Sequence, residues 1–248
     1  MDPLSQFKVF TVFELPKVFG FNIDFTNSAL YMFISILTCM VFLLGIIKVN
    51  SKDNRILSLW QFAVDRFYNF IVNIVKENGG EHALQYKKLF FTMFLFIFSC
   101  NLYGLIPLPM HFTVTSHISV TFMLSMIMFI LIVGAAIKTK KWEFLRTFLP
   151  KGFPIFLAPL MIIVEVSSYF SRPVSLAIRL TANMVAGHII LQVLAGFAVK
   201  LNIFLSLPTV LFMSIVVLFE LFVAFLQAYI FIVLSSVYIG ESLDTEGH

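Results

Sequence analysis

The sequence predicts an all-α integral membrane protein, and composition is the first reason. Of its 248 residues, 60% are hydrophobic and 12% are charged, whereas soluble proteins average about 45–50% apolar and about 25% charged residues. The mean hydropathy of +0.96 leaves too few polar side chains to cover a soluble globule. Several apolar runs are also long enough to cross a hydrocarbon core of about 30 Å as helices.

The first half of the chain predicts three single spans and one surface helix. Apolar and polar residues recur at helical spacing over 58–76, which predicts an amphipathic helix in the membrane interface. A soluble cap packed on the membrane domain would show the same pattern. Residues 1–28 mix charges with short apolar runs, so we expect an N-terminal segment and no cleavable signal. The three predicted spans are 29–47, 89–107 and 118–137.

Basic residues predict the orientation of these spans. They gather between Lys48 and Lys88 and again between Lys138 and Lys151. The positive-inside rule places both connections on the cytoplasmic side or its topological equivalent. The N-terminal segment is therefore expected on the outer side. Because most basic residues lie in these connections, the net charge of +4 does not indicate nucleic-acid binding.

Two apolar stretches, 154–198 and 203–239, exceed the length of one upright span. As helices they would extend roughly 67 Å and 55 Å. Each could form a hairpin or one steeply tilted helix. Residues 214–230 contain no Gly or Pro, and Pro173 lacks a surrounding turn cluster, which favours a distorted helix over a turn. We therefore expect five membrane-crossing helices in a single membrane domain, the last two long and steeply tilted.

A polar stripe lies in the first long stretch. An arginine at the bilayer centre costs roughly 2.5–3.5 kcal/mol, so Arg179 should face protein or water and mark an ion pathway. Glu165 and Arg172 could instead lie near a helix end and reach water. The stripe follows steps of three and four residues, which place its members on one helix face: Glu165, Ser168, Arg172, Ser175, Arg179 and Asn183.

A second polar group involves the other long stretch. His188 follows Arg179 by nine positions, which puts it on the opposite side of a regular helix. Its natural partner is Glu220, with Gln227 two turns further along the same face. A histidine and a carboxylate within reach of each other can pass protons near neutral pH, although a buried structural pair would give the same pattern.

Other kinds of site are not indicated. The possible metal ligands are few and dispersed, and the sequence contains no phosphate loop or nucleophile motif. Cys39 and Cys100 each lie in an apolar run and are interpreted as packing residues. We therefore expect no metal, no cofactor and no catalytic chemistry within this chain.

Three segments together resemble one family. They are SRPVSLAIRLTANMVAGHII from Ser171, NLYGLIP from Asn101, and LFELFVAFLQAYIFIVLSSVYI from Leu218. They resemble subunit a of F-type ATP synthase, the stator half of its proton channel, over almost the whole chain. The FTVTSH run from Phe112 and the opening DPLSQF are most similar to alphaproteobacterial or early-branching mitochondrial forms.

The resemblance implies a role for each polar group. Arg179 would face the carboxylates of a rotor ring of proteolipid subunits, and Glu165 would lie on the inner half-channel. Some members of the family exchange the residue types found here at His188 and Glu220, which supports their working together. The outer half-channel would be lined by Asn183, His188, Glu220 and Gln227.

Further implications concern secondary residues and partners. Asn101, Arg172 and Ser175 are additional possible lining residues, and Asn101 could equally make a hydrogen bond between packed helices. Peripheral-stalk subunits and membrane lipids would be the other partners, with no nucleic acid. The location implied is the mitochondrial inner membrane or the bacterial inner membrane, in a multi-pass arrangement.

Two alternatives from other classes remain at this stage. In a proton-coupled secondary transporter, Arg179 would bind an anionic substrate and Glu220 would couple protons. Inverted repeats and paired broken helices would support that function, and the sequence offers no convincing case of either. A structural membrane anchor would leave the cost of the intramembrane charges unexplained.

Overall fold

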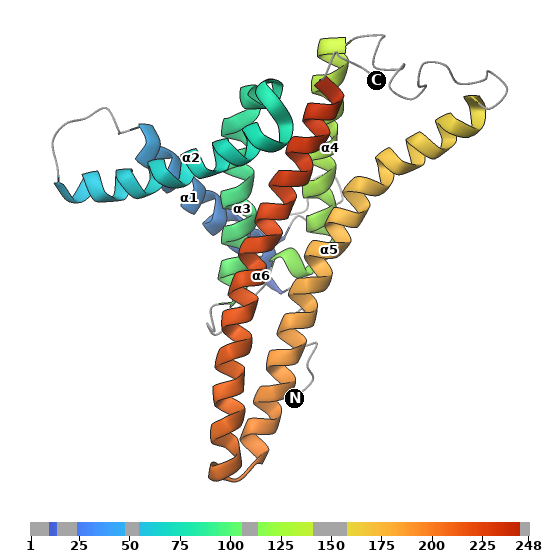
Figure 1. The fold of residues 1–248 in the computed structure, drawn as a ribbon. Coiled ribbons are helices and arrows are strands. Elements are labelled where there is room, and N and C mark those ends of the chain that lie inside the picture. The colour runs from blue at the N-terminus through green and yellow to red at the C-terminus, as the bar shows by residue number, and fades with distance from the viewer. Residues whose placement is uncertain (1–9, 14–23, 48–54, 106–113, 141–157, 244–248) are drawn as a thin grey trace. The chain divides into compact units, whose positions relative to one another are not determined.

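Helices form most of the chain in the computed structural model, which describes residues 10–13, 24–47, 55–105, 114–140 and 158–243. Two short 3-10 turns, η3 (Leu84–Tyr86) and η4 (Val114–Ser116), each precede a longer helix. The helices are α1 (Asn27–Ile47), α2 (Arg55–Ala83), α3 (Lys87–Leu105), α4 (Ile118–Lys140), α5 (Ala158–Lys200) and α6 (Ile203–Leu243), shown in Figure 1.

The predicted all-α membrane class is confirmed. Within the described ranges, five helical stretches are long and apolar enough to cross a membrane. One of them runs from α2 into α3, so the interfacial position expected for residues 58–76 stays a prediction. The five stretches are Asn27–Leu44, Leu59–Leu105, Ile118–Lys138, Leu160–Lys200 and Ser206–Gly240.

The two long apolar stretches are single helices and not hairpins. α5 has 43 residues and continues through Pro173, and α6 has 41 residues and continues through Pro208. A continuous helix satisfies its backbone hydrogen bonds internally, which the bilayer interior requires. The predicted start at Pro154 lies outside the described residues.

A small strand pair before α1 was not predicted. β1 (Thr11–Phe13) and β2 (Phe25–Thr26) pair antiparallel. Asn27 closes this ribbon because its side-chain oxygen accepts hydrogen bonds from the backbone N–H of Phe10 at 3.2 Å and of Ser28 at 2.9 Å. Asparagine is a favoured residue at a helix start, and here it also fixes the chain that enters α1.

Contacts divide the chain into two compact units. Unit 1 contains residues 1–44, 95–120 and 180–228, and unit 2 contains residues 45–94, 121–179 and 229–248. The helices α3, α5 and α6 each contribute to both. Each unit is described by itself below.

In unit 1, hydroxyl and thiol groups join α1 to α3. The Ser35 hydroxyl donates to the backbone carbonyl of Tyr31 at 2.9 Å, and the Cys100 thiol lies 3.3 Å from the Ser35 oxygen. Thr38 and Tyr103 share a second hydrogen bond between the same helices. Cys39 and Cys100 are both buried, so they contribute packing, as predicted from the sequence.

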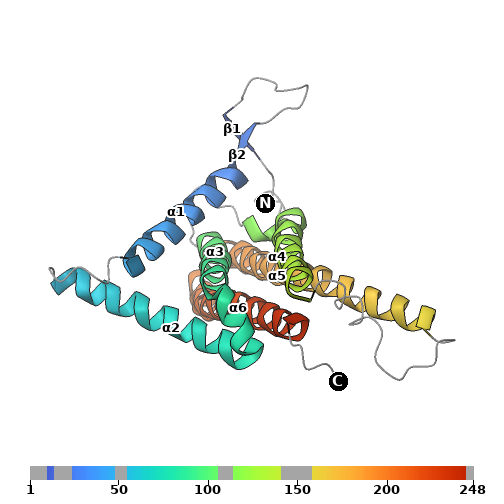
Figure 2. The same cartoon turned by 90° about the horizontal axis from the view of Figure 1, so that it is seen from above.

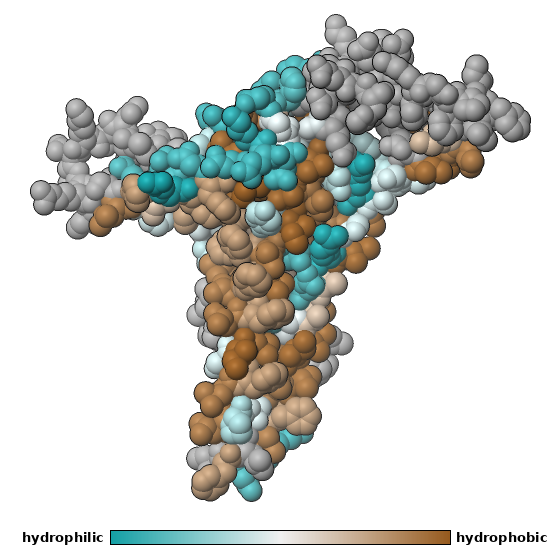
Figure 3. All heavy atoms as spheres, viewed as in Figure 1, coloured by the Kyte–Doolittle hydropathy of each residue, from teal (hydrophilic) through white to brown (hydrophobic). Residues whose placement is uncertain are grey.

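In unit 2, aromatic rings join α2 to α3. The Phe67 ring meets Phe94 edge to face at 5.3 Å between centroids, and Tyr68 meets Phe91 in the same way at 5.2 Å. Phe91 and Phe94 are fully buried. The opposite side of α2 is hydrophilic, which is visible as the teal band along this helix in Figure 3. The helix α2 therefore covers the predicted amphipathic range with one aromatic side and one hydrophilic side, and it runs from Arg55 to Ala83 with a kink at Gly80.

Two glycines allow a close backbone approach in unit 2. A Cβ atom at Gly240 would lie 2.9 Å from both the Cα and the carbonyl oxygen of Gly79, and a Cβ atom at Gly79 would lie 2.5 Å from the carbonyl oxygen of Ser236. Gly80 follows with φ +67°, a conformation that favours glycine. In Figure 2 the end of α2 lies beside α6, as this contact requires.

We expect Gly240→Ala to lower the stability of the protein by about 1–3 kcal/mol, because the new methyl group would press on backbone atoms that have no rotamer to yield. Thermal unfolding of the purified protein in detergent, followed by circular dichroism, measures the change. Gly134→Ala in α4 is the matched control, since a Cβ atom there meets nothing within 4 Å. Equal melting temperatures for the two variants would contradict the importance of the contact.

Candidate functional site

The polar stripe of α5 begins in unit 2, and Arg179 is its exposed charge. Ser168, Ser175 and Arg179 are exposed, and Arg172 is half-buried. The side chain of Glu165 lies outside those that the structure describes. Among the described residues, no hydrogen bond or ion pair joins Arg179 to another side chain. The stripe therefore presents a cation that this part of the chain does not neutralise.

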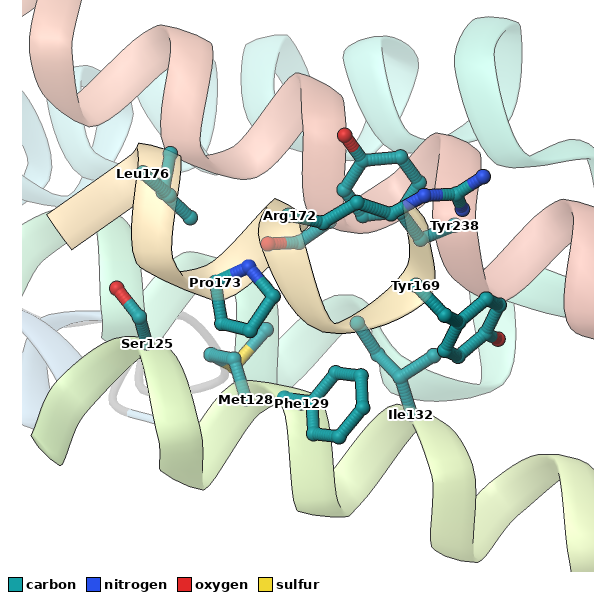
Figure 4. Close-up of a pocket in the computed structure, with 10 residues that line it drawn as sticks. Ser125, Met128, Phe129, Ile132, Tyr169, Arg172, Pro173, Leu176 and Tyr238 are labelled. Carbon is teal, nitrogen blue, oxygen red and sulfur yellow. The ribbon is translucent and has the colours of Figure 1, made fainter. Parts of the chain in front are cut away.

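Arg172 differs from Arg179 because aromatic rings surround it. Its guanidinium carbon lies 5.0 Å from the ring centroid of Tyr169 and 4.3 Å from that of Tyr238. Figure 4 shows Arg172 and Tyr169 on α5 and Tyr238 on α6. A ring face attracts a cation through its quadrupole, so part of the cost of placing this charge among apolar helices is met inside unit 2.

The second polar group lies in unit 1 and is buried. His188 is 5% exposed, Glu220 is 7% exposed and Gln227 is 6% exposed. Asn183, on the same helix as His188, is half-buried. Because His188 is buried while Arg179 is exposed, the two residues occupy different sides of α5, as their spacing predicted.

Glu220 occupies a niche beside Gly187. A Cβ atom at Gly187 would lie 2.8 Å from the carboxyl carbon of Glu220 and closer still to one of its oxygens. Any other residue at this position would therefore have to displace the carboxyl group. Gly187 immediately precedes His188, so the niche brings the acid to the backbone of the predicted imidazole partner.

No hydrogen bond joins the Glu220 carboxyl to His188, and the pairing of the two residues in proton transfer stays a prediction. Neither carboxyl oxygen of Glu220 has a hydrogen-bond partner among the described residues, although both oxygens are buried. Native proteins leave few buried polar groups unbonded, and each exception calls for water, an ion or a chemical use. Water that reaches this niche could donate hydrogen bonds to the carboxyl oxygens. A proton bound to the carboxyl group would instead remove its negative charge.

Asn101 forms a polar link between three segments of unit 1. Its side-chain oxygen accepts a hydrogen bond from the Thr115 hydroxyl at 2.7 Å, and its amide nitrogen donates to the carbonyl oxygen of Ala224 at 3.4 Å. Asn101 is fully buried. Of the two possibilities left by the sequence, these bonds favour helix packing, and they hold η4 against α3 and α6.

The polar side chains of unit 1 include an acid and an imidazole, two groups that can exchange protons. Within the described ranges, no group of three or more His, Cys, Asp or Glu side chains could hold a metal ion. The buried polar group of unit 1 offers a carboxyl, an imidazole and amides, and the stripe in unit 2 separately offers a fixed cation. These groups can accept, hold and release protons, and they can attract an anion.

Comparison with known proteins decides the family. The family described as the ATP synthase A chain matches residues 29–240. The chain belongs to this family. It is similar to ATP synthase subunit a of Wolbachia sp. subsp. Drosophila simulans, with 50% identity over 98% of this chain and 99% of the relative. The corresponding protein of Ehrlichia chaffeensis is 48% identical over 98% of both chains.

These comparisons confirm the resemblance seen in the sequence. The relatives are alphaproteobacterial, which agrees with the form predicted from the FTVTSH and DPLSQF segments. The relatives' names concern a subunit of ATP synthase, and the helices described above make this chain a membrane protein.

Sequence reasoning missed three residues that shape the site. Gly187 stands beside His188, but its contact with Glu220 depends on another helix. Thr115 binds Asn101 across 14 positions, and Tyr238 reaches Arg172 from α6. The only local signal was the small residue next to an intramembrane histidine, which is too common in membrane helices to indicate a niche.

We expect Asn101→Leu and Thr115→Val to be strongly coupled, because each removes a partner of the same buried hydrogen bond. Each single change should lower the stability of the protein by about 1–3 kcal/mol. The loss of stability in the double variant should be smaller than the sum of the two single losses by about 0.5–3 kcal/mol. Thermal unfolding of the four proteins completes the cycle.

Thr92→Val is the control for loss of a threonine hydroxyl, since that group bonds only the carbonyl oxygen of Lys88 one turn earlier. Additive losses for Asn101 and Thr115 would show that the link does not contribute as a unit.

Proposed function

We propose that the chain is the proton-translocating stator subunit of an F-type ATP synthase. In this function it forms two offset half-channels with a rotor ring, so that proton flow drives rotation and ATP synthesis. The observation that carries the proposal is Arg179, an exposed cation in an apolar helix with no neutralising partner among the described residues. Membrane proteins tolerate such a charge where it serves a pathway or meets an external partner.

The proposed partner of Arg179 is a carboxylate on the rotor ring. A guanidinium stays protonated in proteins and has no lone pair to accept a proton, so a proton does not hop through it. It attracts an ionised carboxylate and holds it in that form. Arg179 therefore separates the two half-channels while it allows each rotor carboxylate to pass.

The exposed face around Arg179 suits the close approach of another helix. Small residues let helix backbones pack closely in membranes, where van der Waals contact drives association. Large apolar side chains flank this face on α5, such as Ile178 at 49% exposure. The small exposed residues of the same face are Ser168, Ser171, Ser175, Ala182 and Ala186.

The outer half-channel is assigned to the buried polar group of unit 1. Glu220 and His188 would pass protons from the outer side to a rotor carboxylate, with Asn183 and Gln227 along the path. The niche at Gly187 supports this assignment because it holds an acid whose oxygens have no described partner. Glu165 is assigned to the inner half-channel, and Asn101, Arg172 and Ser175 would contribute to the lining or its packing.

The same proposal fixes the partners and the location. The chain would work with the rotor ring, the peripheral-stalk subunits and lipids, without catalytic chemistry or a cofactor of its own. It would reside in the inner membrane, bacterial or mitochondrial, with several passes. A proton-coupled transporter would instead bind a solute as an isolated chain, so purification with or without a proteolipid ring separates the two functions.

We expect Arg179→Lys to abolish ATP synthesis driven by an imposed proton gradient. An ammonium group is more strongly hydrated than guanidinium and can lose its proton when it is desolvated, so it cannot replace a permanent charge. Vesicles containing the reconstituted complex provide the measurement. Arg66→Lys in α2 is the matched control, because Arg66 is also exposed and lies over the ring of Phe62. Near-normal synthesis by the Arg179 variant would refute the assignment.

We expect Gly187→Ala to reduce proton-driven synthesis roughly tenfold to a hundredfold, because the methyl group displaces the Glu220 carboxyl from its place in the path. Gly196→Ala on the same helix is the control, since a Cβ atom there meets nothing within 4 Å. Equal activity of the two variants would show that the position of the carboxyl group is unimportant.

A further inference from the structure

Arg172 lies next to the weakest point of α5. Pro173 has no N–H group, so it cannot donate to the carbonyl oxygen of Tyr169, the residue four positions earlier. A helix that lacks this bond bends more readily at that place. The guanidinium of Arg172 lies over the ring of Tyr169 and therefore spans the same turn from which the backbone bond is missing.

A cavity adjoins this turn. Its walls come from α4, α5 and α6, and they include Met128, Phe129, Pro173 and Leu176 (Figure 4). The volume of the cavity is about 20 Å³, enough for about one water molecule. The hydroxyl oxygen of Ser125, another wall residue, is buried and has no hydrogen-bond partner among the described residues. Packing next to Pro173 is thus incomplete, so fewer side-chain contacts oppose bending of the helix at this place.

Tyr238 supplies a tie from outside α5. Its ring centroid lies 4.3 Å from the Arg172 guanidinium, closer than that of Tyr169 at 5.0 Å. The cation is thus shared by one ring of its own helix and one ring of α6. A movement of the α5 segment before Pro173 away from α6 would break the contact with Tyr238.

We propose that Arg172 is a positioning residue, a brace that fixes the direction of α5 across Pro173. Four observations within unit 2 support the brace: the missing backbone bond, the cavity, the unbonded Ser125 hydroxyl and the two ring contacts. The inference rests on the proposed function, because the brace sets the place of Glu165 and Ser168 relative to Arg179 on one face of α5. It assigns Arg172 a mechanical role in place of the channel-lining role that its position in the stripe suggested.

The two roles give opposite results when the rings are changed. A lining charge acts on protons through its own charge, so it would keep its effect without Tyr238. A brace depends on the ring face and does not depend on the tyrosine hydroxyl. Tyr238→Phe retains the face and Tyr238→Leu removes it, which makes these two variants a matched pair.

The direct test measures the bend of α5 in the purified complex. Spin labels at Ile163→Cys and Ile178→Cys flank Pro173, and both native side chains are exposed. Cys39→Ala and Cys100→Ala remove the native thiols. We expect Tyr238→Leu and Arg172→Gln to broaden the distance distribution between the labels by electron spin resonance. Tyr238→Phe should leave the distribution narrow, and Arg172→Lys should broaden it less than Arg172→Gln.

Proton-driven ATP synthesis is the second readout. Tyr238→Leu should lower it roughly threefold to thirtyfold, the range that loss of a partly buried cation–π contact allows. Tyr238→Phe should retain it, and the double variant Arg172→Gln with Tyr238→Leu should be no worse than Arg172→Gln alone. An unchanged distance distribution in Tyr238→Leu would overturn the brace, and unchanged synthesis in that variant would overturn its link to proton-driven synthesis.

A second pair of variants and the independence of the two readouts complete the test. If Tyr238→Leu does not assemble, Tyr169→Leu with Tyr169→Phe tests the same brace from the α5 side. The distance measurement does not depend on proton transport. Normal synthesis in Arg179→Lys would therefore refute the proposed function alone, whereas a narrow distribution in Tyr238→Leu would refute the brace alone.

Discussion

Placing a charge among apolar helices carries a large cost, and the chain meets that cost differently at three of its intramembrane charges. Arg172 lies between two aromatic rings. Glu220 is buried in a niche that glycine makes possible. Arg179 is exposed and has no described partner within the chain. Arg172 is thus a charge held by packing, Glu220 is an acid held in the interior, and Arg179 is a cation available to an external group.

The second constraint is close backbone approach, because some helix contacts in this fold leave no space for a side chain larger than that of glycine. Gly79 and Gly240 allow it between α2 and α6 in unit 2, and Gly187 allows the carboxyl of Glu220 to lie against α5 in unit 1. Membrane helices lack a hydrophobic driving force for association, so small residues that increase contact have a larger role there than in soluble cores. Glycine at these positions stabilises the fold by leaving space.

The sequence predicted what depends on one helix at a time. Run lengths predicted the spans and the two long helices, and a period of 3.6 placed Arg179 and His188 on different sides of α5. Contacts between distant segments were beyond its reach. The bond between Thr115 and Asn101, the niche of Glu220 and the ring of Tyr238 over Arg172 all depend on how helices pack. The β1–β2 ribbon was missed because strands of two or three residues leave no periodic signal.

The division of α5 has a mechanistic consequence within the proposed function. Arg179 is exposed and His188 is buried on the other side of the same helix, nine residues further along. In the proposed function, a proton held near His188 and Glu220 does not pass through Arg179, because the arginine cannot accept it. Passage requires a carrier that takes the proton from the buried group and returns it elsewhere on the stripe. A moving carboxylate on a partner meets this requirement, since it is neutral when protonated and is attracted to Arg179 when it is not.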